Sequence, residues 1–221
     1  NDYPEYGDYG DTYTTSGWAV ETDSSIEADE GAGAELISPV YESPKEMLED
    51  MKSLFDWNEE RAEFGTNGTT GLHVTMSWQG EKAKANRLKM ALLVGDNYLL
   101  SEFDRLRNSY TKSQYNTLLK AAEKMQRGDS QGFEEFEKIL SAGLSTDKFS
   151  SINFKNEKDD TSGNKLIEFR IGGGRDYHEK MDTITKAVIR YATVMKAGYD
   201  DNAFKKDYVS AVSRLLRKSV E

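Results

Sequence analysis

Two apolar segments about a hundred residues apart constrain the fold most, because each is typical of a strand and each carries polar side chains. They are residues 71–74 (Gly-Leu-His-Val) and 166–170 (Leu-Ile-Glu-Phe-Arg). Side chains alternate between the two faces of a strand, so Glu168 and Arg170 point the same way. If the two strands share a sheet, His73 can lie on the same face as Glu168 and Arg170. An imidazole, a carboxylate and a guanidinium together can hold a divalent metal beside an anionic phosphate.

Each of these residues also has a plainer interpretation. His73 is one of two histidines, and a single histidine in an apolar strand is more often a hydrogen-bonded core residue than a metal ligand. Glu168 and Arg170 would equally form an ion pair on a solvated sheet face. The residues alone leave both interpretations open.

Charge is unevenly distributed along the chain. Residues 1–44 hold eleven acidic residues and no Lys or Arg. The whole chain has 39 acidic and 29 basic residues, so residues 45–221 carry 28 acidic and 29 basic residues. Residues 1–16 are acidic, rich in Tyr and Gly and without apolar periodicity, which predicts an extended tail. Residues 17–221 are predicted to form a single domain. The neutral body lacks the basic stripe of a nucleic-acid surface, so no nucleic-acid partner is expected.

Other compositional features exclude further classes. No run approaches 18 apolar residues, so no membrane span is expected. The chain has no cysteine, hence no disulfide framework and no thiolate site, which fits a reducing compartment such as the cytoplasm. There is no phosphate loop, dinucleotide fingerprint or nucleophile elbow.

The order of predicted elements is that of an α+β protein. Strands are expected at 18–20, 34–38, 71–78, 150–154 and 165–171. A helix is expected over 44–63, where Ser43, Pro44 and Glu46 form a start signal. The apolar periodicity predicts further helices. They are marked by Leu88 to Phe103 with a break near Gly95, by Leu118 to Met125, by Phe133, Phe136, Ile139 and Leu140 after a cap at Ser130, by Met181 to Met195, and by Phe204 to Leu215.

Three weaker signals accompany these segments. The run Gly172-Gly173-Gly174-Arg175 would let a backbone approach a phosphate, or form a flexible turn. Arg105, Arg107 and Lys112 form a basic cluster that would receive an anion, or solvate a helix face. Clustered carboxylates at Glu21, Asp23 and Glu35 would hold a cation, or be ordinary acidic decoration.

Taken in order, several segments resemble the amidoligase family, carboxylate–amine ligases related to glutamine synthetase and glutamate–cysteine ligase. The matching pieces are 18–25 (Trp-Ala-Val-Glu-Thr-Asp-Ser-Ser), 33–39 (Gly-Ala-Glu-Leu-Ile-Ser-Pro), 70–74 (Thr-Gly-Leu-His-Val), 107–110 (Arg-Asn-Ser-Tyr), Asn153 and 167–170 (Ile-Glu-Phe-Arg). They follow the family's order at similar spacing. Glutamine synthetase has a comparable Gly-Met-His strand and a later Glu-x-Arg strand.

The resemblance implies a fold, a reaction and a set of site residues. The fold would be a curved, mainly antiparallel sheet with helices packed on one side, as in the glutamine synthetase-like catalytic domain. Glu35, His73 and Glu168 would hold Mg²⁺ on ATP, while Arg170 and Arg107 would bind phosphate. Glu168 and Arg170 would be the catalytic pair. The reaction would convert a substrate carboxylate into an acyl phosphate, which an amine attacks to form an amide.

The chain departs from the family's pattern in two places. The usual opening strand with Glu-x-Glu has no clear counterpart, and the usual His-x-His is here His73-Val74-Thr75. These departures define a second hypothesis, a catalytically silent relative that serves as a structural or assembly protein. Amidoligase-like genes occur in bacteriophages, so such a protein would be a processed virion component that self-assembles or binds a protein partner.

Overall fold

The computed structural model describes residues 17–28, 31–61, 64–79, 84–125, 133–155, 157 and 166–218. These residues form two compact units, and each is described by itself. The first unit comprises the described residues before Gly71 together with Gly174–Met181, and the second comprises Gly71–Gly173 with Asp182 onward. The sequence predicted one domain over 17–221, and that stays a prediction. The predicted tail over 1–16 lies outside the described residues.

The first unit is a β-hairpin with one long helix. Strands β1 (Ala19–Thr22) and β2 (Ala34–Ile37) lie where strands were predicted, and they pair antiparallel. Helix α1 (Pro44–Arg61) begins where the sequence placed its start, because the hydroxyl of Ser43 accepts the N–H of Glu46 at 3.2 Å. The short 3₁₀ helix η1 (Tyr177–Glu179) completes this unit.

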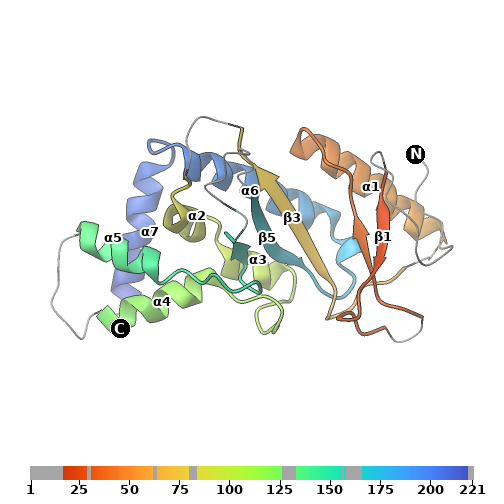
Figure 1. The fold of residues 1–221 in the computed structure, drawn as a ribbon, viewed down its shortest axis with the longest axis horizontal. Coiled ribbons are helices and arrows are strands. Elements are labelled where there is room, and N and C mark those ends of the chain that lie inside the picture. Colours follow the sequence, from red (N-terminus) through yellow and green to blue (C-terminus); the bar gives the residue numbers. More distant parts are fainter. Residues whose placement is uncertain are drawn as a thin grey trace. The chain divides into compact units, whose positions relative to one another are not determined.

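The second unit combines a three-stranded antiparallel sheet with six helices among its described residues (Figure 1). The sheet order is β3-β5-β4, so β5 is central. The strands are β3 (Gly71–Ser77), β4 (Ile152–Asn153) and β5 (Leu166–Gly173). The helices are α2 (Arg87–Leu93), α3 (Asp96–Glu102), α4 (Gln114–Met125), α5 (Phe133–Ala142), α6 (Met181–Tyr199, whose first residue belongs to the first unit) and α7 (Lys205–Lys218). The predicted α+β class is confirmed.

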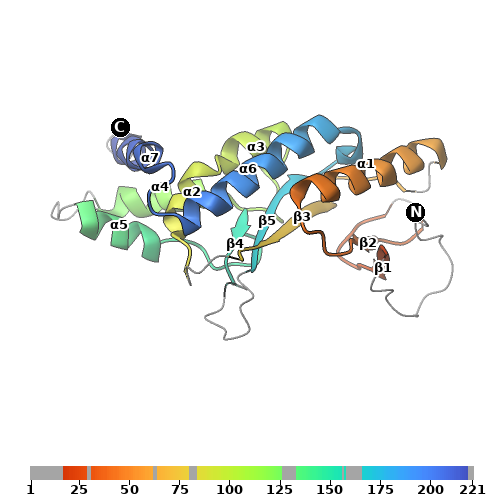
Figure 2. The ribbon, with the colours of Figure 1, turned by 90° about the horizontal axis from the view of Figure 1, so that it is seen from above.

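One face of the central strand β5 is buried under helices. Ile167 and Phe169 are fully buried. The ring of Phe169 stacks on Tyr191 of α6, with 4.3 Å between centroids and 7° between planes. Helices α3 and α6 lie on this side of the sheet (Figure 2). The alternation predicted from the sequence is therefore confirmed, and Glu168 and Arg170 are on the opposite face.

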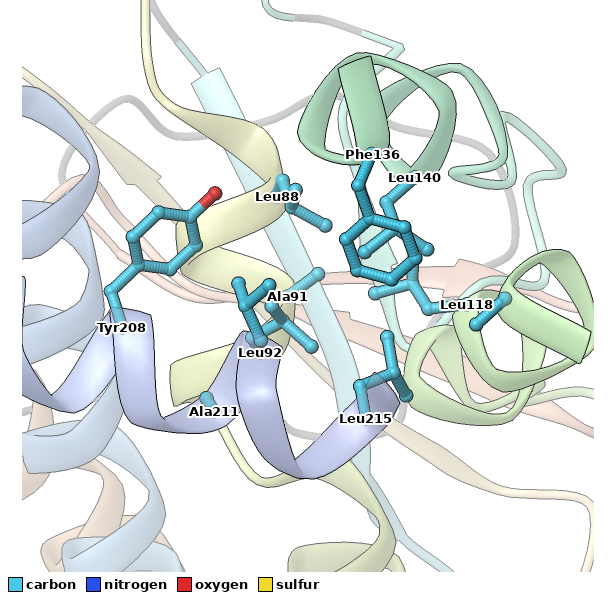
Figure 3. Packing of buried hydrophobic residues seen from close by; sticks show 11 residues of the cluster. Leu88, Ala91, Leu92, Leu118, Phe136, Leu140, Tyr208, Ala211 and Leu215 are labelled. Carbon is cyan, nitrogen blue, oxygen red and sulfur yellow. The ribbon is translucent and has the colours of Figure 1, made fainter. Parts of the chain in front are cut away.

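The helices form a second apolar core beside the sheet. Figure 3 shows side chains from α2, α4, α5 and α7 pointing toward one another. The buried members are Leu88, Ala91, Leu92, Leu118, Ala122, Phe136, Leu140, Tyr208, Ala211, Val212 and Leu215. Burial of this many apolar side chains is the main driving force for packing the four helices.

Three of the apolar residues that mark the predicted helices are exposed. Phe133 is 44% exposed, Ile139 38% and Phe204 43%. Phe133 is the first residue of α5, at the end of the helix. Ile139 lies about 100° around the axis from the buried Leu140, so both cannot face the same narrow core. Phe204 precedes α7 and has a left-handed φ of 54°, so it lies outside the helical periodicity.

The predicted helix break near Gly95 is confirmed. Gly95 has φ 66° and ψ 48°, the left-handed conformation that glycine adopts without steric cost, and it separates α2 from α3. The chain therefore turns directly before Asp96, whose carboxylate enters the protein interior.

Among the described helices, none has both the length and the hydropathy that crossing a bilayer requires.

Candidate functional site

The exposed face of the sheet brings three of the predicted residues together within the second unit. Arg170 Nη1 donates to Glu168 Oε1 at 2.8 Å and lies 3.4 Å from His73 Nδ1. His73 Nδ1 is 3.6 Å from Glu168 Oε1. The side chains of Glu168 and Arg170 are 17% exposed and that of His73 is 32% exposed. The cluster is thus half-buried and in contact with solvent.

A β-bulge lies next to His73 in the pairing of β3 with β5. Val74 pairs with Phe169 and Leu72 pairs with Gly172, so β5 has one more residue than β3 between these pairs. Bulges of this kind redirect side chains. Val74 and its partner Phe169 are both buried, so alternation along each strand puts His73 and Arg170 on the other face.

Asn153 is a fourth member that the sequence did not assign to the site. Its position in β4 is paired with Glu168, and its Nδ2 donates to Glu168 Oε2 at 2.9 Å. Asn153 Oδ1 accepts the N–H of Lys155 at 2.9 Å, which fixes the orientation of the amide. Both oxygens of Glu168 therefore have protein donors. Asn153 appeared among the matching family segments, but its pairing depends on strand register, which the sequence does not specify.

Arg105 supports the cluster from the protein interior. The sequence placed it in an exposed basic cluster, yet it is only 2% exposed. Its Nη1 donates to the carbonyl of Gly172 and lies 3.4 Å from the carbonyl of Arg170. Thr111 Oγ1 donates to the same Arg170 carbonyl at 3.0 Å. Arg107, the predicted phosphate ligand, is exposed in the segment between α3 and α4.

The glycine run 172–174 lies at the end of strand β5. Gly172 and Gly173 are the last residues of β5, and both are buried. Gly173 and Gly174 have φ of 116° and 94°, which other residues adopt only with strain. In the first unit the N–H of Gly174 donates to the carbonyl of Thr70 at 2.9 Å. That N–H is therefore already bonded within the protein.

The third predicted metal ligand, Glu35, belongs to the first unit. It lies on β2, exposed and directly opposite Glu21 of β1. Asp23, by contrast, has a local role, because its Oδ1 accepts the N–H of Ser25 at 2.8 Å. Among the described residues, no three His, Asp or Glu side chains gather as a metal-ligand group. The set of Glu35, His73 and Glu168 draws on both units and stays a prediction.

A second buried carboxylate, which the sequence did not indicate, lies elsewhere in the second unit. Glu157 accepts the N–H of Ala85 at 2.7 Å, Arg87 Nε at 2.5 Å and the hydroxyl of Tyr199 at 3.2 Å. Burial and then the adjacent Glu157 carboxylate raise the pKa of Tyr199 above its ordinary value. A pocket is lined by Lys84, Ala85, Arg87 and Glu157. Through Arg87 and Tyr199, Glu157 links the start of α2 to the end of α6.

Comparison of the chain with protein-family models, with curated proteins and with solved structures finds no match in any of the three. The resemblance to amidoligases therefore rests on the sequence segments alone, and the geometry of the sheet face has to be considered on its own chemistry.

Proposed function

We propose that the chain is an ATP- and Mg²⁺-dependent carboxylate–amine ligase of the amidoligase type, which forms an amide through an acyl phosphate. One observation carries the proposal. His73, Glu168 and Arg170 come from strands about a hundred residues apart in the sequence, yet their polar atoms lie 2.8 to 3.6 Å from one another on an exposed sheet face.

The finer fold proposal is a glutamine synthetase-like catalytic domain. The predicted curvature is not found, because the sheet of the second unit is small and not strongly curved. This sheet is antiparallel throughout and carries α3 and α6 on one face, so the other face is available to substrates. Polar groups that serve catalysis are expected on such a face, because they would be costly in the buried one.

The donor atoms of the cluster suit a nucleotide-bound magnesium ion. Mg²⁺ is typically held by one or two carboxylates, with phosphate oxygens and water completing six ligands. Glu168 supplies one carboxylate beside the imidazole of His73. When bound, the ion would neutralise charge on the transferring phosphoryl group.

The chain's own side chains would act by position and charge. Arg170 binds and orients phosphate oxygens, with Arg107 as the second phosphate ligand. Glu168 holds its carboxylate toward the cluster, and the hydrogen bond from Asn153 at 2.9 Å keeps that carboxylate from rotating. Fixed charges of this kind stabilise a developing negative charge without reorganisation.

A second candidate function is favoured by the same network. Both oxygens of Glu168 already have protein donors, so this carboxylate is satisfied without a ligand. A silent amidoligase-like structural or assembly protein, such as a processed virion component, would need no more than this. It would act through self-association or a protein partner docked on the acidic segment 1–16.

Calorimetric titration with ATP, with and without Mg²⁺, separates the two candidates. The ligase proposal expects metal-dependent binding that is lost in His73→Ala and in Glu168→Gln. The matched control is Glu102→Gln, which removes a negative charge from the exposed end of α3 and should leave binding unchanged. Absence of binding at millimolar ATP would reject the ligase. The structural candidate would then require that deletion of residues 1–16 abolishes self-association in sedimentation experiments.

A further inference from the structure

The guanidinium of Arg170 lies beside the two atoms that a metal ion would need as ligands, Glu168 Oε1 and His73 Nδ1. Its Nη1 is 2.8 Å from Glu168 Oε1 and 3.4 Å from His73 Nδ1, while those two atoms are 3.6 Å apart. Two neighbouring ligands of Mg²⁺ lie about 3 Å apart, since each metal–ligand bond is about 2.1 Å. Glu168 and His73 are thus almost at ligand spacing, but a protein cation lies beside both.

The Arg170 side chain is incompletely satisfied in this position. Its Nε is buried and has no hydrogen-bond partner among the described residues. A buried N–H without an acceptor costs free energy, and a guanidinium pairs most strongly with a carboxylate or a phosphate through two parallel hydrogen bonds. Movement toward a polyphosphate would therefore supply acceptors that the present arrangement lacks.

Glu168 would keep its place if Arg170 moved. Its second oxygen, Oε2, accepts from Asn153 Nδ2 at 2.9 Å, and Asn153 is itself fixed by the N–H of Lys155. The carboxylate is therefore held independently of the guanidinium.

We propose that Arg170 is a displaceable internal cation: it excludes a divalent metal from Glu168 and His73 until the polyphosphate of a nucleotide draws the guanidinium away. This inference rests on the proposed function for the identity of the anion. Its consequence is an order of binding. A divalent ion alone does not bind the cluster, because two cations at this spacing repel each other in a half-buried site. The ion and the nucleotide bind together.

The chain offers a direct readout, because His73 is one of only two histidines. Labelled imidazole resonances of the full chain are followed by NMR, and His178→Gln assigns the signal of His73. Mn²⁺ replaces Mg²⁺, since its unpaired electrons broaden the signals of its ligands. The wild-type chain is compared with Arg170→Gln, in Mn²⁺ alone and in Mn²⁺ with ATP. The matched control is Arg214→Gln, which removes a positive charge from the exposed face of α7.

In the wild-type chain, Mn²⁺ alone should leave the His73 signal sharp, and Mn²⁺ with ATP should broaden it. In Arg170→Gln, Mn²⁺ alone should broaden it, with an affinity at least about tenfold above that of the wild type. Arg214→Gln should behave as the wild type. Equal broadening by Mn²⁺ alone in the wild type and in Arg170→Gln would overturn the inference, as would a folded Arg170→Gln that gains no Mn²⁺ affinity.

A measurement on the unmodified chain covers the case in which Arg170→Gln does not fold. ATP with the diamagnetic Mg²⁺ should shift the Nε–H resonance of Arg170, and an unchanged resonance in protein saturated with Mg²⁺ and ATP would overturn the inference. Failure of the internal-cation proposal and failure of the ligase proposal remain distinguishable. Mn²⁺ affinity gained in Arg170→Gln, without ATP binding to the wild type, would retain the internal cation and reject the ligase. Metal-dependent ATP binding without that gain would retain the ligase and reject the internal cation.

Discussion

The imidazole of His73 lies against the backbone of Gly71, so closely that a Cβ atom at residue 71 would be 2.8 Å from His73 Nε2. Carbon and nitrogen atoms in ordinary contact are well over 3 Å apart, so no larger residue fits there without moving the ring. The missing side chain at residue 71 therefore lets Nε2 lie over the strand while Nδ1 faces Arg170 and Glu168.

Gly71→Ala should displace the His73 ring at little cost in stability. The strand itself accepts alanine, and the ring can move to another rotamer, so the free energy of unfolding should change by less than about 1.5 kcal/mol. The His73 imidazole resonances should shift, and any metal-dependent ATP binding should weaken. Gly65→Ala is the control, because a Cβ at residue 65 has no atom within 4 Å. Unchanged His73 resonances in Gly71→Ala would contradict the role of this glycine.

Asp96→Ala should be among the most destabilising changes in the second unit. The Asp96 carboxylate is fully buried and accepts the N–H of Gln114 and the hydroxyl of Ser151, both at 2.6 Å. Asp96 is the first residue of α3, and its carboxylate thereby caps the first turn of α4. Its loss leaves buried donors unpaired, so urea unfolding should show a loss of about 2–4 kcal/mol. The exposed Glu102→Ala should change stability by less than about 0.5 kcal/mol. A similar small loss in Asp96→Ala would refute the capping role.

The same carboxylate predicts a pH dependence of unusual sign. Burial raises the pKa of Asp96 above its ordinary value, against hydrogen bonds from Ser151, Ser113 and the backbone that lower it. Because the pKa is higher in the folded state, the folded chain takes up the proton first as the pH falls. The contribution of Asp96 to stability is then complete below the unfolded pKa of about 3.9 and is lost as the pH rises through the folded pKa.

The test compares the wild type with Asp96→Asn, which cannot titrate. The stability of the wild type relative to this variant should be greater at pH 4.5 than at pH 7, as measured by urea unfolding at both values. A difference that is constant, or that shrinks toward acid, would show that the hydrogen bonds outweigh burial.

Local sequence patterns were sufficient to predict the strands and helices and part of the candidate site. The alternation in residues 166–170 is a property of the strand alone, so the sequence correctly placed Glu168 and Arg170 on one face. The start of α1 at Ser43 and the break at Gly95 are likewise local signals. Each depends on residues within one turn of the feature that it predicts.

Long-range features were not predictable from one sequence. The partnership of Asn153 with Glu168 depends on strand register across a connection of more than ten residues. The burial of Arg105 and Asp96 runs against the usual exposure of charged residues, and it is stable only because carbonyls and N–H groups from distant segments surround them. Nothing near either residue in the sequence marks those partners.

Arg105→Met tests whether the buried guanidinium maintains the bulge next to His73. Methionine keeps most of the apolar volume but donates no hydrogen bond, so the carbonyls of Gly172 and Arg170 lose a charged donor in the interior. The expected loss is about 2–4 kcal/mol in urea unfolding. Because Thr111 still donates to the Arg170 carbonyl, the strand should remain paired.

The backbone amides of Gly172 and its neighbours should exchange faster with deuterium in Arg105→Met, and the His73 resonances should shift with them. Arg107→Met is the matched control, since Arg107 is two residues away, carries the same charge and is exposed. It should change stability by less than about 0.5 kcal/mol. Equal effects of the two substitutions would mean that Arg105 contributes only surface charge, and the bulge between Leu72 and Val74 would then be maintained by the strand pairing itself.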